Sequence, residues 1–281
     1  MLKQRVITAL LLLAILIPAV LHPAAEVFGI VALVLIAAGA WEWGKLNHLS
    51  HAASIGAGLL CAVVCLLSWY SGLLSVSLNL LWVVVSCGWV LIGAWLLKGG
   101  IAAWSRVPMP LRLVGGLIAL WAAWLAVLQA RMIGHNFLFS VLVLVWVADV
   151  FAYFFGRAFG GRFIAQKLAV TISPGKSWEG AIGGMLGVVA CAFIWRMLDS
   201  QNRWIPVSLY SELGAGGTWF MVVAVVFMGA MSVVGDLVES LFKRSAGVKD
   251  SSGLLPGHGG VLDRVDALLP ILPLAMMLTS R

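Results

Sequence analysis

Residues 232–266 read SVVGDLVESLFKRSAGVKDSSGLLPGHGGVLDRVD, and they are the one long stretch of this chain in which acids, bases, glycines and a histidine lie together. The apolar run from Trp219 to Met231 continues into it without a breaker. Its first part is therefore predicted to be the end of a membrane helix. On such a helix four polar positions at i, i+3, i+4 and i+7 share one face: Asp236, Glu239, Ser240 and Lys243.

The second part of the stretch is predicted to be loop. The sequence PGHGG at 256–260 favours a flexible turn that exposes backbone N–H groups, and Asp263 and Asp266 then open the last apolar segment. Two pairs of carboxylates, each spaced i, i+3, thus flank a loop that carries three bases: Lys243, Arg244 and Lys249. Carboxylates hold hard divalent cations, and such cations bridge phosphate oxygens. The pattern therefore predicts a metal and polyphosphate site.

The composition excludes an ordinary soluble domain. Of 281 residues, 62% are hydrophobic and 10% are charged, whereas soluble domains have nearer a quarter charged. We expect an all-α, polytopic membrane protein with one membrane domain, in which an N-terminal helical half (1–131) precedes a catalytic half (132–281). The net charge of +7 is spread over loops between apolar runs, so no nucleic-acid partner is expected. The four cysteines lie in apolar runs and are interpreted as packing residues.

Nine membrane spans are predicted from the apolar runs, and the last four are expected to enclose a polar cavity that faces the cytoplasm. The first run also fits a secretory signal, but its poor cleavage context favours an uncleaved span. The last span contains Pro270 and Pro273 and is expected to be short and kinked. The spans are placed at about 6–21, 25–46, 53–70, 78–97, 113–129, 137–155, 179–198, 218–242 and 261–279.

The basic residues separate cleanly between alternating loops. With the N-terminus in the cytoplasm, 14 of the 18 Lys and Arg residues fall on the cytoplasmic side. Both polar loops of interest, near Lys176 and near Lys249, then face the cytoplasm. We predict a multi-pass protein of the inner membrane with its N-terminus and active site cytoplasmic. Four bases fall on the other side: Arg131, Arg196, Arg203 and Arg281.

Several polar residues outside the first stretch are candidates for the same site. Asp149 lies deep in an apolar run, where an acid costs roughly 2.5–3.5 kcal/mol, so it is expected to face a cavity or to pair with a base. Lys176 follows a Pro-Gly turn, and Ser177 is a candidate N-cap of the next helix, which together favour phosphate binding. His258 is open as a metal ligand, a general base or a turn residue. Glu42 is expected to anchor its helix at the membrane interface.

At this point the sequence resembles the phosphatidate cytidylyltransferases, also called CDP-diacylglycerol synthases. The resemblance is dense over the C-terminal half and extends to the segment 173–180, whereas the N-terminal half is similar only in being hydrophobic. It is carried by these residues in this order: Ser240, Lys243-Arg244, Lys249-Asp250, Pro256-Gly257-His258-Gly259-Gly260, Asp263-Arg264 and Asp266.

The resemblance implies transfer of a cytidylyl group from CTP to phosphatidic acid, which gives CDP-diacylglycerol and pyrophosphate. It implies Mg²⁺, as two divalent or mixed metal ions, with Asp236 and Asp263 as principal ligands and Asp266 or Asp149 assisting. Lys249 joins the two aspartates as a catalytic residue. Self-association into a homodimer is left open. The candidate substrate-binding residues are Asp149, Lys176, Ser240, Lys243, Arg244, His258 and Arg264.

Two other functions are weighed against this one. A CTP-dependent lipid kinase of the dolichol-kinase kind would use the same nucleotide and metals, with His258 or Glu239 as general base. An ion-coupled transporter would also place acids such as Asp149 in the membrane, but such proteins usually contain inverted repeats, and the sequence shows none.

Overall fold

The computed structural model describes residues 2–202 and 207–280, which form helices and connecting loops with two isolated β-bridges. Eight of the helices, α1 to α7 and α9, are long and apolar enough to cross a membrane. The protein is therefore an all-α polytopic membrane protein. The elements are α1 (Leu2–Leu21), α2 (Ala25–Leu46), α3 (His51–Tyr70), the 3₁₀ turn η1 (Leu73–Ser75), α4 (Asn79–Arg106), α5 (Met109–Ile133), α6 (His135–Phe159), α7 (Trp178–Asn202), α8 (Leu209–Ala215), α9 (Thr218–Ser245), α10 (Leu262–Val265) and α11 (Leu268–Thr279).

The ninth expected span is not confirmed as a membrane crossing. The segment folds as α10 and α11, and α11 has 12 residues, including Pro273 within the helix. At 1.5 Å per residue it is about 18 Å long, which is shorter than the ~30 Å core of a bilayer. Its side chains from Leu269 to Met276 are buried. It is an interior helix packed against α4, α5 and α9.

Two further elements differ from the expectation. The fourth span was expected to end at Leu97, but α4 continues to Arg106 across a break at Gly100, whose φ is 61°. The short helix α8 was not predicted at all. It begins at an N-cap, Ser208, whose hydroxyl accepts a hydrogen bond from the N–H of Ser211. Arg203 and Arg281, two of the bases expected on the non-cytoplasmic side, lie outside the described residues.

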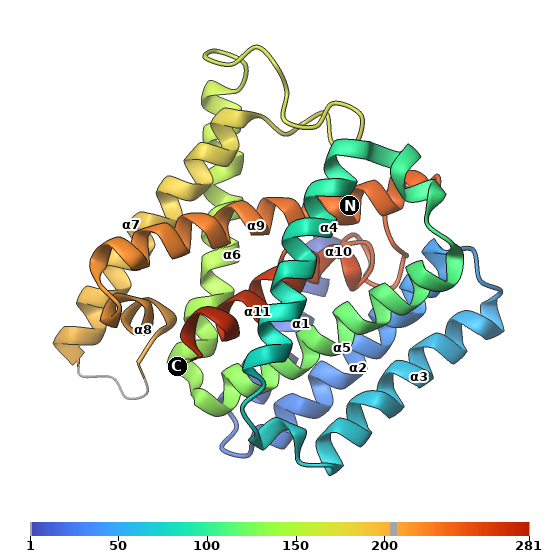
Figure 1. Cartoon of the computed structure of the whole chain (residues 1–281), viewed down its shortest axis with the longest axis horizontal. Coiled ribbons are helices and arrows are strands. Elements are labelled where there is room, and N and C mark those ends of the chain that lie inside the picture. Colours follow the sequence, from blue (N-terminus) through green and yellow to red (C-terminus); the bar gives the residue numbers. More distant parts are fainter. Residues whose placement is uncertain (1, 203–206, 281) are drawn as a thin grey trace.

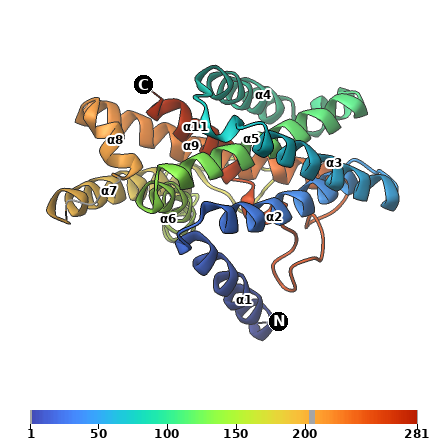
Figure 2. The same cartoon turned by 90° about the horizontal axis from the view of Figure 1, so that it is seen from below.

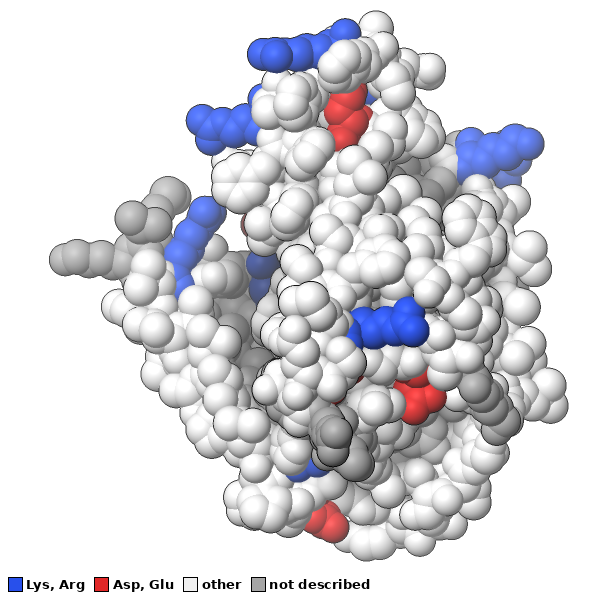
Figure 3. All heavy atoms as spheres, turned by 90° about the vertical axis from the view of Figure 1, so that its left-hand side faces the viewer, with Lys and Arg blue, Asp and Glu red and all other residues white. Residues whose placement is uncertain are grey.

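The helices form two groups, and α9 reaches the second one through α11, which packs against both α9 and α5. Figure 1 shows α6 and α7 as a long antiparallel pair with the loop 160–177 at its upper end, and α2, α3 and α5 as a second group. Helix α9 crosses between them and contacts both α7 and α4. Figure 2 shows α1 leaning away from the other helices. The face seen in Figure 3 is largely uncharged, with several Lys and Arg side chains near its upper end.

Helices α6 and α7 can approach closely because α7 carries glycines on the facing side. A Cβ atom at Gly180 would lie 2.8 Å from the carbonyl oxygen of Ala152, and one at Gly184 would lie 2.8 Å from that of Ala148. Small residues at membrane helix interfaces allow this kind of backbone approach. The close packing brings Asp149, the neighbour of Ala148, to a pocket that residues at the start of α7 also line.

Contacts between loops agree with the expected alternation of sides. At one end of the bundle the Thr8 hydroxyl donates to the carbonyl of Pro256 at 2.9 Å, and Lys176 pairs with Asp236. At the other end the Arg131 guanidinium donates to the carbonyl of His22, and Asn136 donates to Asp199. Segments expected on the same side of the membrane therefore lie together.

Candidate active site

A polar pocket of about 420 Å³ lies between α6, α7 and α9. Asp149 enters it from α6, Asp236 from α9 and Lys176 from the loop before α7, and Arg157 also lines it. The ammonium of Lys176 is 2.5 Å from a carboxylate oxygen of Asp236, and these side chains are 27% and 32% exposed. Within the described chain Asp149 forms no ion pair. A ligand that enters this pocket can therefore contact both positively and negatively charged side chains.

The local sequence positions these groups. The Ser177 hydroxyl accepts a hydrogen bond from the N–H of Gly180, which confirms Ser177 as the N-cap of α7. Lys176 therefore lies directly before the N-terminus of that helix. Ser240, one turn after Asp236, donates to its carboxylate at 3.3 Å. Glu179 had no predicted role, yet its carboxylate accepts from three backbone N–H groups of the loop after α6: Gly161, Phe163 and Ile164.

Asp266, between α10 and α11, does not line the pocket, but its carboxyl is influenced by the acids that do. Burial, and then the negative charge of Asp236, raise the pKa of the Asp266 carboxyl to about 7, although the N–H of Ala267 and the charge of Lys243 lower it; Asp149 adds the smallest of these effects. Three of the predicted acidic residues therefore lie close enough for their charges to repel, although they come from α6, α9 and the junction before α11. Repulsion of this kind is typical of sites that receive cations.

Lys243 forms a second charged group on the same end of α9. Its ammonium lies between the carboxylates of Glu239 and Asp263. Asp263 also accepts from the backbone N–H groups of Ser251 and Gly260 and from the Ser251 hydroxyl, so its side chain is only 4% exposed. Burial would raise the pKa of Asp263, but these donors outweigh burial and hold the pKa below its usual value.

Glu42 corrects one expectation. It was expected at the membrane interface, but it is fully buried on α2. Its carboxylate accepts hydrogen bonds from the polar loop, whose residues lie 209 to 220 positions later in the sequence. It accepts from the hydroxyls of Ser251 and Ser252 and from the backbone N–H groups of Val261 and Leu262. We call this arrangement, Glu42 with residues 251–262, the loop anchor. An acid within a span is costly unless it has partners, and that cost was the available signal.

The PGHGG turn requires its glycines for two reasons. Gly257 and Gly259 have φ of 77° and 81°, a region that L side chains rarely adopt. At Gly260 a Cβ atom would lie 2.3 Å from a Glu42 carboxylate oxygen, so the loop anchor leaves no room for a side chain. His258 is half-buried in this turn, and its Nδ1 has no hydrogen-bond partner among the described residues.

The remaining predicted bases point to solvent. Arg244, Lys249 and Arg264 are exposed, and Arg244 donates to the carbonyl of Val248. The structure thus gathers Asp149, Lys176 and Asp236 in one pocket. It places Lys243 and Asp263 in a neighbouring internal network and leaves Arg244 at the end of α9, Lys249 in the loop and Arg264 in α10 exposed.

The fold and this pocket define a helical membrane protein with a charged site at one end of its bundle, suited to phosphates and cations. A sequence model of the family described as "Cytidylyltransferase family" matches residues 3–280, and the chain belongs to that family.

Relatives named phosphatidate cytidylyltransferase include three bacterial proteins. The protein from Pseudomonas aeruginosa is 38% identical over 287 residues, which cover 97% of this chain and 95% of that protein. The protein from Haemophilus influenzae is 49% identical over 140 residues, 50% of this chain and 44% of that protein. The protein from Brucella abortus is 45% identical over 133 residues, 47% of this chain and 42% of that protein.

Proposed function

We propose that this chain transfers a cytidylyl group from CTP to phosphatidic acid and releases pyrophosphate, an early step of phospholipid synthesis. The observation that carries the proposal is similarity over nearly the whole chain, 38% identity across 97% of it, to a protein named for that reaction. The polar pocket supports it, because a pocket that combines Lys176 and Arg157 with Asp149 and Asp236 provides partners for both phosphates and cations.

The pocket suits magnesium bound together with substrate. Among residues 2–202 and 207–280 no three His, Cys, Asp or Glu side chains are gathered as a ready-made metal site. Mg²⁺, however, is usually held by one or two carboxylates plus substrate phosphates rather than by a protein cage. Asp236 with Asp149 or Asp266 would hold a divalent cation, or two. Asp263 would have to exchange one of its present donors to become a ligand.

The chain has only to position two anions and neutralise their charge. An oxygen of the lipid phosphate attacks the α-phosphorus of CTP, a new P–O bond forms, and the bond to the β-phosphate oxygen breaks as pyrophosphate leaves. Bound Mg²⁺ would withdraw charge from the phosphate oxygens. Lys176 can turn from Asp236 to a phosphate oxygen, and the exposed Lys249 of the loop and Arg244 at the end of α9 can contact the nucleotide phosphates. No protein nucleophile is needed.

The proposed site faces the cytoplasm, where CTP is made, and the protein lies in the inner membrane. The positive-inside distribution supports this orientation, as does the gathering of Lys176, Asp236 and the 251–262 loop at one end of the bundle. The homodimer stays a prediction.

The test is incubation of purified protein with Mg²⁺ and CTP labelled in the cytidine ring, with and without phosphatidic acid. Label should enter the lipid phase only when phosphatidic acid and Mg²⁺ are both present. Label that stays in water as CDP while a lipid alcohol gains phosphate would instead show a lipid kinase. No transfer under any condition would overturn the proposal.

A further inference from the structure

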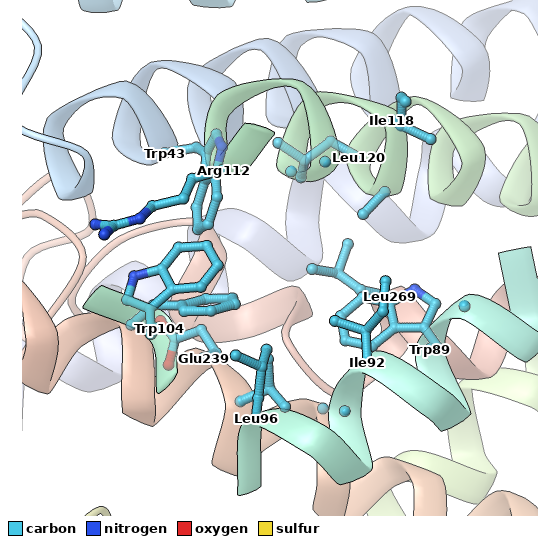
Figure 4. Close-up of a pocket in the computed structure, with 18 of the residues that line it drawn as sticks. Trp43, Trp89, Ile92, Leu96, Trp104, Arg112, Ile118, Leu120, Glu239 and Leu269 are labelled. Atoms are coloured by element: carbon cyan, nitrogen blue, oxygen red, sulfur yellow. The ribbon is translucent and has the colours of Figure 1, made fainter. Parts of the chain in front are cut away.

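A second cavity of about 520 Å³ lies on the other side of α9, between α4 and α5, and the proposed reaction leaves it without a role (Figure 4). Its size falls within the roughly 300–1,000 Å³ of small-molecule sites. Helices α4 and α5 each pack against α11, which forms part of the floor through Leu269. The walls are mainly tryptophan and aliphatic side chains.

The cavity is polar at one end and apolar at the other. Figure 4 shows Arg112 and Glu239 near Trp104, with Trp89 and Ile118 at the opposite end. Arg112 stands in the first turn of α5, and its guanidinium donates to the carbonyls of Val107 and Ser105. No carboxylate of the described residues pairs with it. The Glu239 carboxylate is paired with Lys243, so Arg112 is the charged group at this end that has no described partner of opposite charge.

The rim of the cavity faces the surface that a bilayer would cover. Ile92 on α4 is 58% exposed and Ile118 on α5 is 49% exposed, although both line the cavity. Exposed apolar side chains on spanning helices contact lipid. The cavity therefore opens sideways to the bilayer, with its charged end at the end of the bundle that carries the 251–262 loop.

One helix separates this cavity from the polar pocket. Gly235 lines the cavity and its neighbour Asp236 lines the polar pocket, so the two spaces lie on different faces of α9. A helix with its side chains is about 10–12 Å across, a distance that a lipid with separate head and tails can bridge around the helix end.

We propose that this cavity receives an acyl chain of phosphatidic acid, which enters sideways from the bilayer with its phosphate toward Arg112. The identity of the lipid rests on the proposed function. A chain that leaves the bilayer for an apolar cavity gains little transfer energy, because both surroundings are apolar. The cavity therefore positions the lipid and selects among lipids by the length and shape of the acyl chain.

Glycines in the wall allow the cavity to be filled without disturbing the packing. A Cβ atom at Gly88 or Gly115 would meet no protein atom within 4 Å, and both residues line the cavity. Gly56 on α3 is equally open but lies outside the cavity, so Gly56→Leu is the matched control. Gly88→Leu and Gly115→Leu are compared with wild type on dioleoyl and on dihexanoyl phosphatidic acid.

The filled variants should lose at least about tenfold in kcat/KM for the dioleoyl lipid, the scale on which apolar pockets discriminate, and keep their value for the short dihexanoyl lipid. Gly56→Leu should match wild type on both lipids. Equal activity of all proteins on both lipids, or parallel loss on both lipids in the filled variants, would overturn the assignment.

A second measurement uses the unaltered protein and so does not depend on how a variant folds. Phosphatidic acid with a photoreactive group in its acyl chain should label the segments 84–96 and 111–120, and photoreactive phosphatidylcholine should label them far less. Equal labelling by both lipids, or labelling elsewhere, would overturn the assignment. Wild-type protein that transfers no cytidylyl group would overturn the proposed function instead, while the labelling pattern would still report on the cavity.

Discussion

Asp236 and Asp263 carry the same chemical group in different surroundings. Their replacement is therefore predicted to affect turnover and thermal stability differently. Asp236 is partly exposed in the polar pocket, so Asp236→Asn should lower turnover at least about a hundredfold and raise the Mg²⁺ concentration needed, with little change in stability. Asp263→Asn should lower turnover and thermal stability together, because it also breaks the pair with Lys243. The measurements are initial rates across a Mg²⁺ titration and thermal unfolding in detergent.

The control for both variants is Glu26→Gln, which alters an exposed carboxylate in the first turn of α2. It should behave as wild type in both measurements. Near-normal activity of Asp236→Asn would remove Asp236 from the proposed catalytic groups.

Glu42 should matter for stability more than for chemistry. Glu42→Ala leaves the backbone N–H groups of Val261 and Leu262 buried without their acceptor, and each such group costs about 1–3 kcal/mol. We expect a lower midpoint of thermal unfolding and faster proteolysis within residues 251–262, with lost activity as a consequence. Glu26→Ala should change stability by no more than about 0.5 kcal/mol. An unchanged cleavage rate in the loop would contradict the role of the loop anchor.

The charged residues of the site could be predicted from sequence only in part. Asp149, Asp236 and Lys176 lie in polar interruptions of apolar runs, and the cost of burying charge makes them candidates from the sequence alone. Glu42 satisfies the same rule, but its partners lie more than 200 residues away, and a single sequence gives no distance across the fold. The saturation of Asp263 by four donors could not be foreseen for the same reason.

Among the helices, the pair α6–α7 is the one on which the polar pocket depends. Gly184→Val would press a branched side chain against the carbonyl of Ala148, next to Asp149. We expect the helices to separate, with a loss of at least about 1–3 kcal/mol from overpacking and a large loss of activity. Gly56→Val on α3 meets open space and is the control, and both are followed by thermal unfolding and by the cytidylyl-transfer rate. Normal activity of Gly184→Val would show that close packing at this point is not required.

Long apolar runs made eight of the helices predictable, because a bilayer demands about 20 apolar residues for each crossing. The ends were harder to place. Lys98, Gly99 and Gly100 read as the end of a span, yet the chain resumes a helical path after a single residue with positive φ. Helix α11 is apolar for a different reason, since it is enclosed by other helices rather than by lipid. Hydropathy does not separate these two environments.

The arrangement of the entire bundle predicts which loops share a side of the membrane. The segment between α3 and α4 lies with the start of α6, since Gln129 near the end of α5 donates to the carbonyl of Val76. The loop 160–177 and the loop 246–261 lie at the opposite end, where Lys176 of the first pairs with Asp236 on α9 and Pro256 of the second accepts a hydrogen bond from Thr8 on α1. We expect the second end to face the cytoplasm, because the basic residues crowd it.

Single cysteines test this orientation in intact cells. The four native cysteines, Cys61, Cys65, Cys87 and Cys191, are first replaced so that Ser77→Cys, Lys167→Cys or Lys249→Cys is the sole thiol. All three positions are exposed and lie outside the membrane-spanning helices. With the active site in the cytoplasm, a membrane-impermeant maleimide should label Ser77→Cys in spheroplasts, whereas the two lysine positions should react only after permeabilisation. Labelling of Lys249→Cys in sealed spheroplasts would invert the topology, and labelling of Lys167→Cys but not Lys249→Cys would separate the two loops that the proposed site requires on one side.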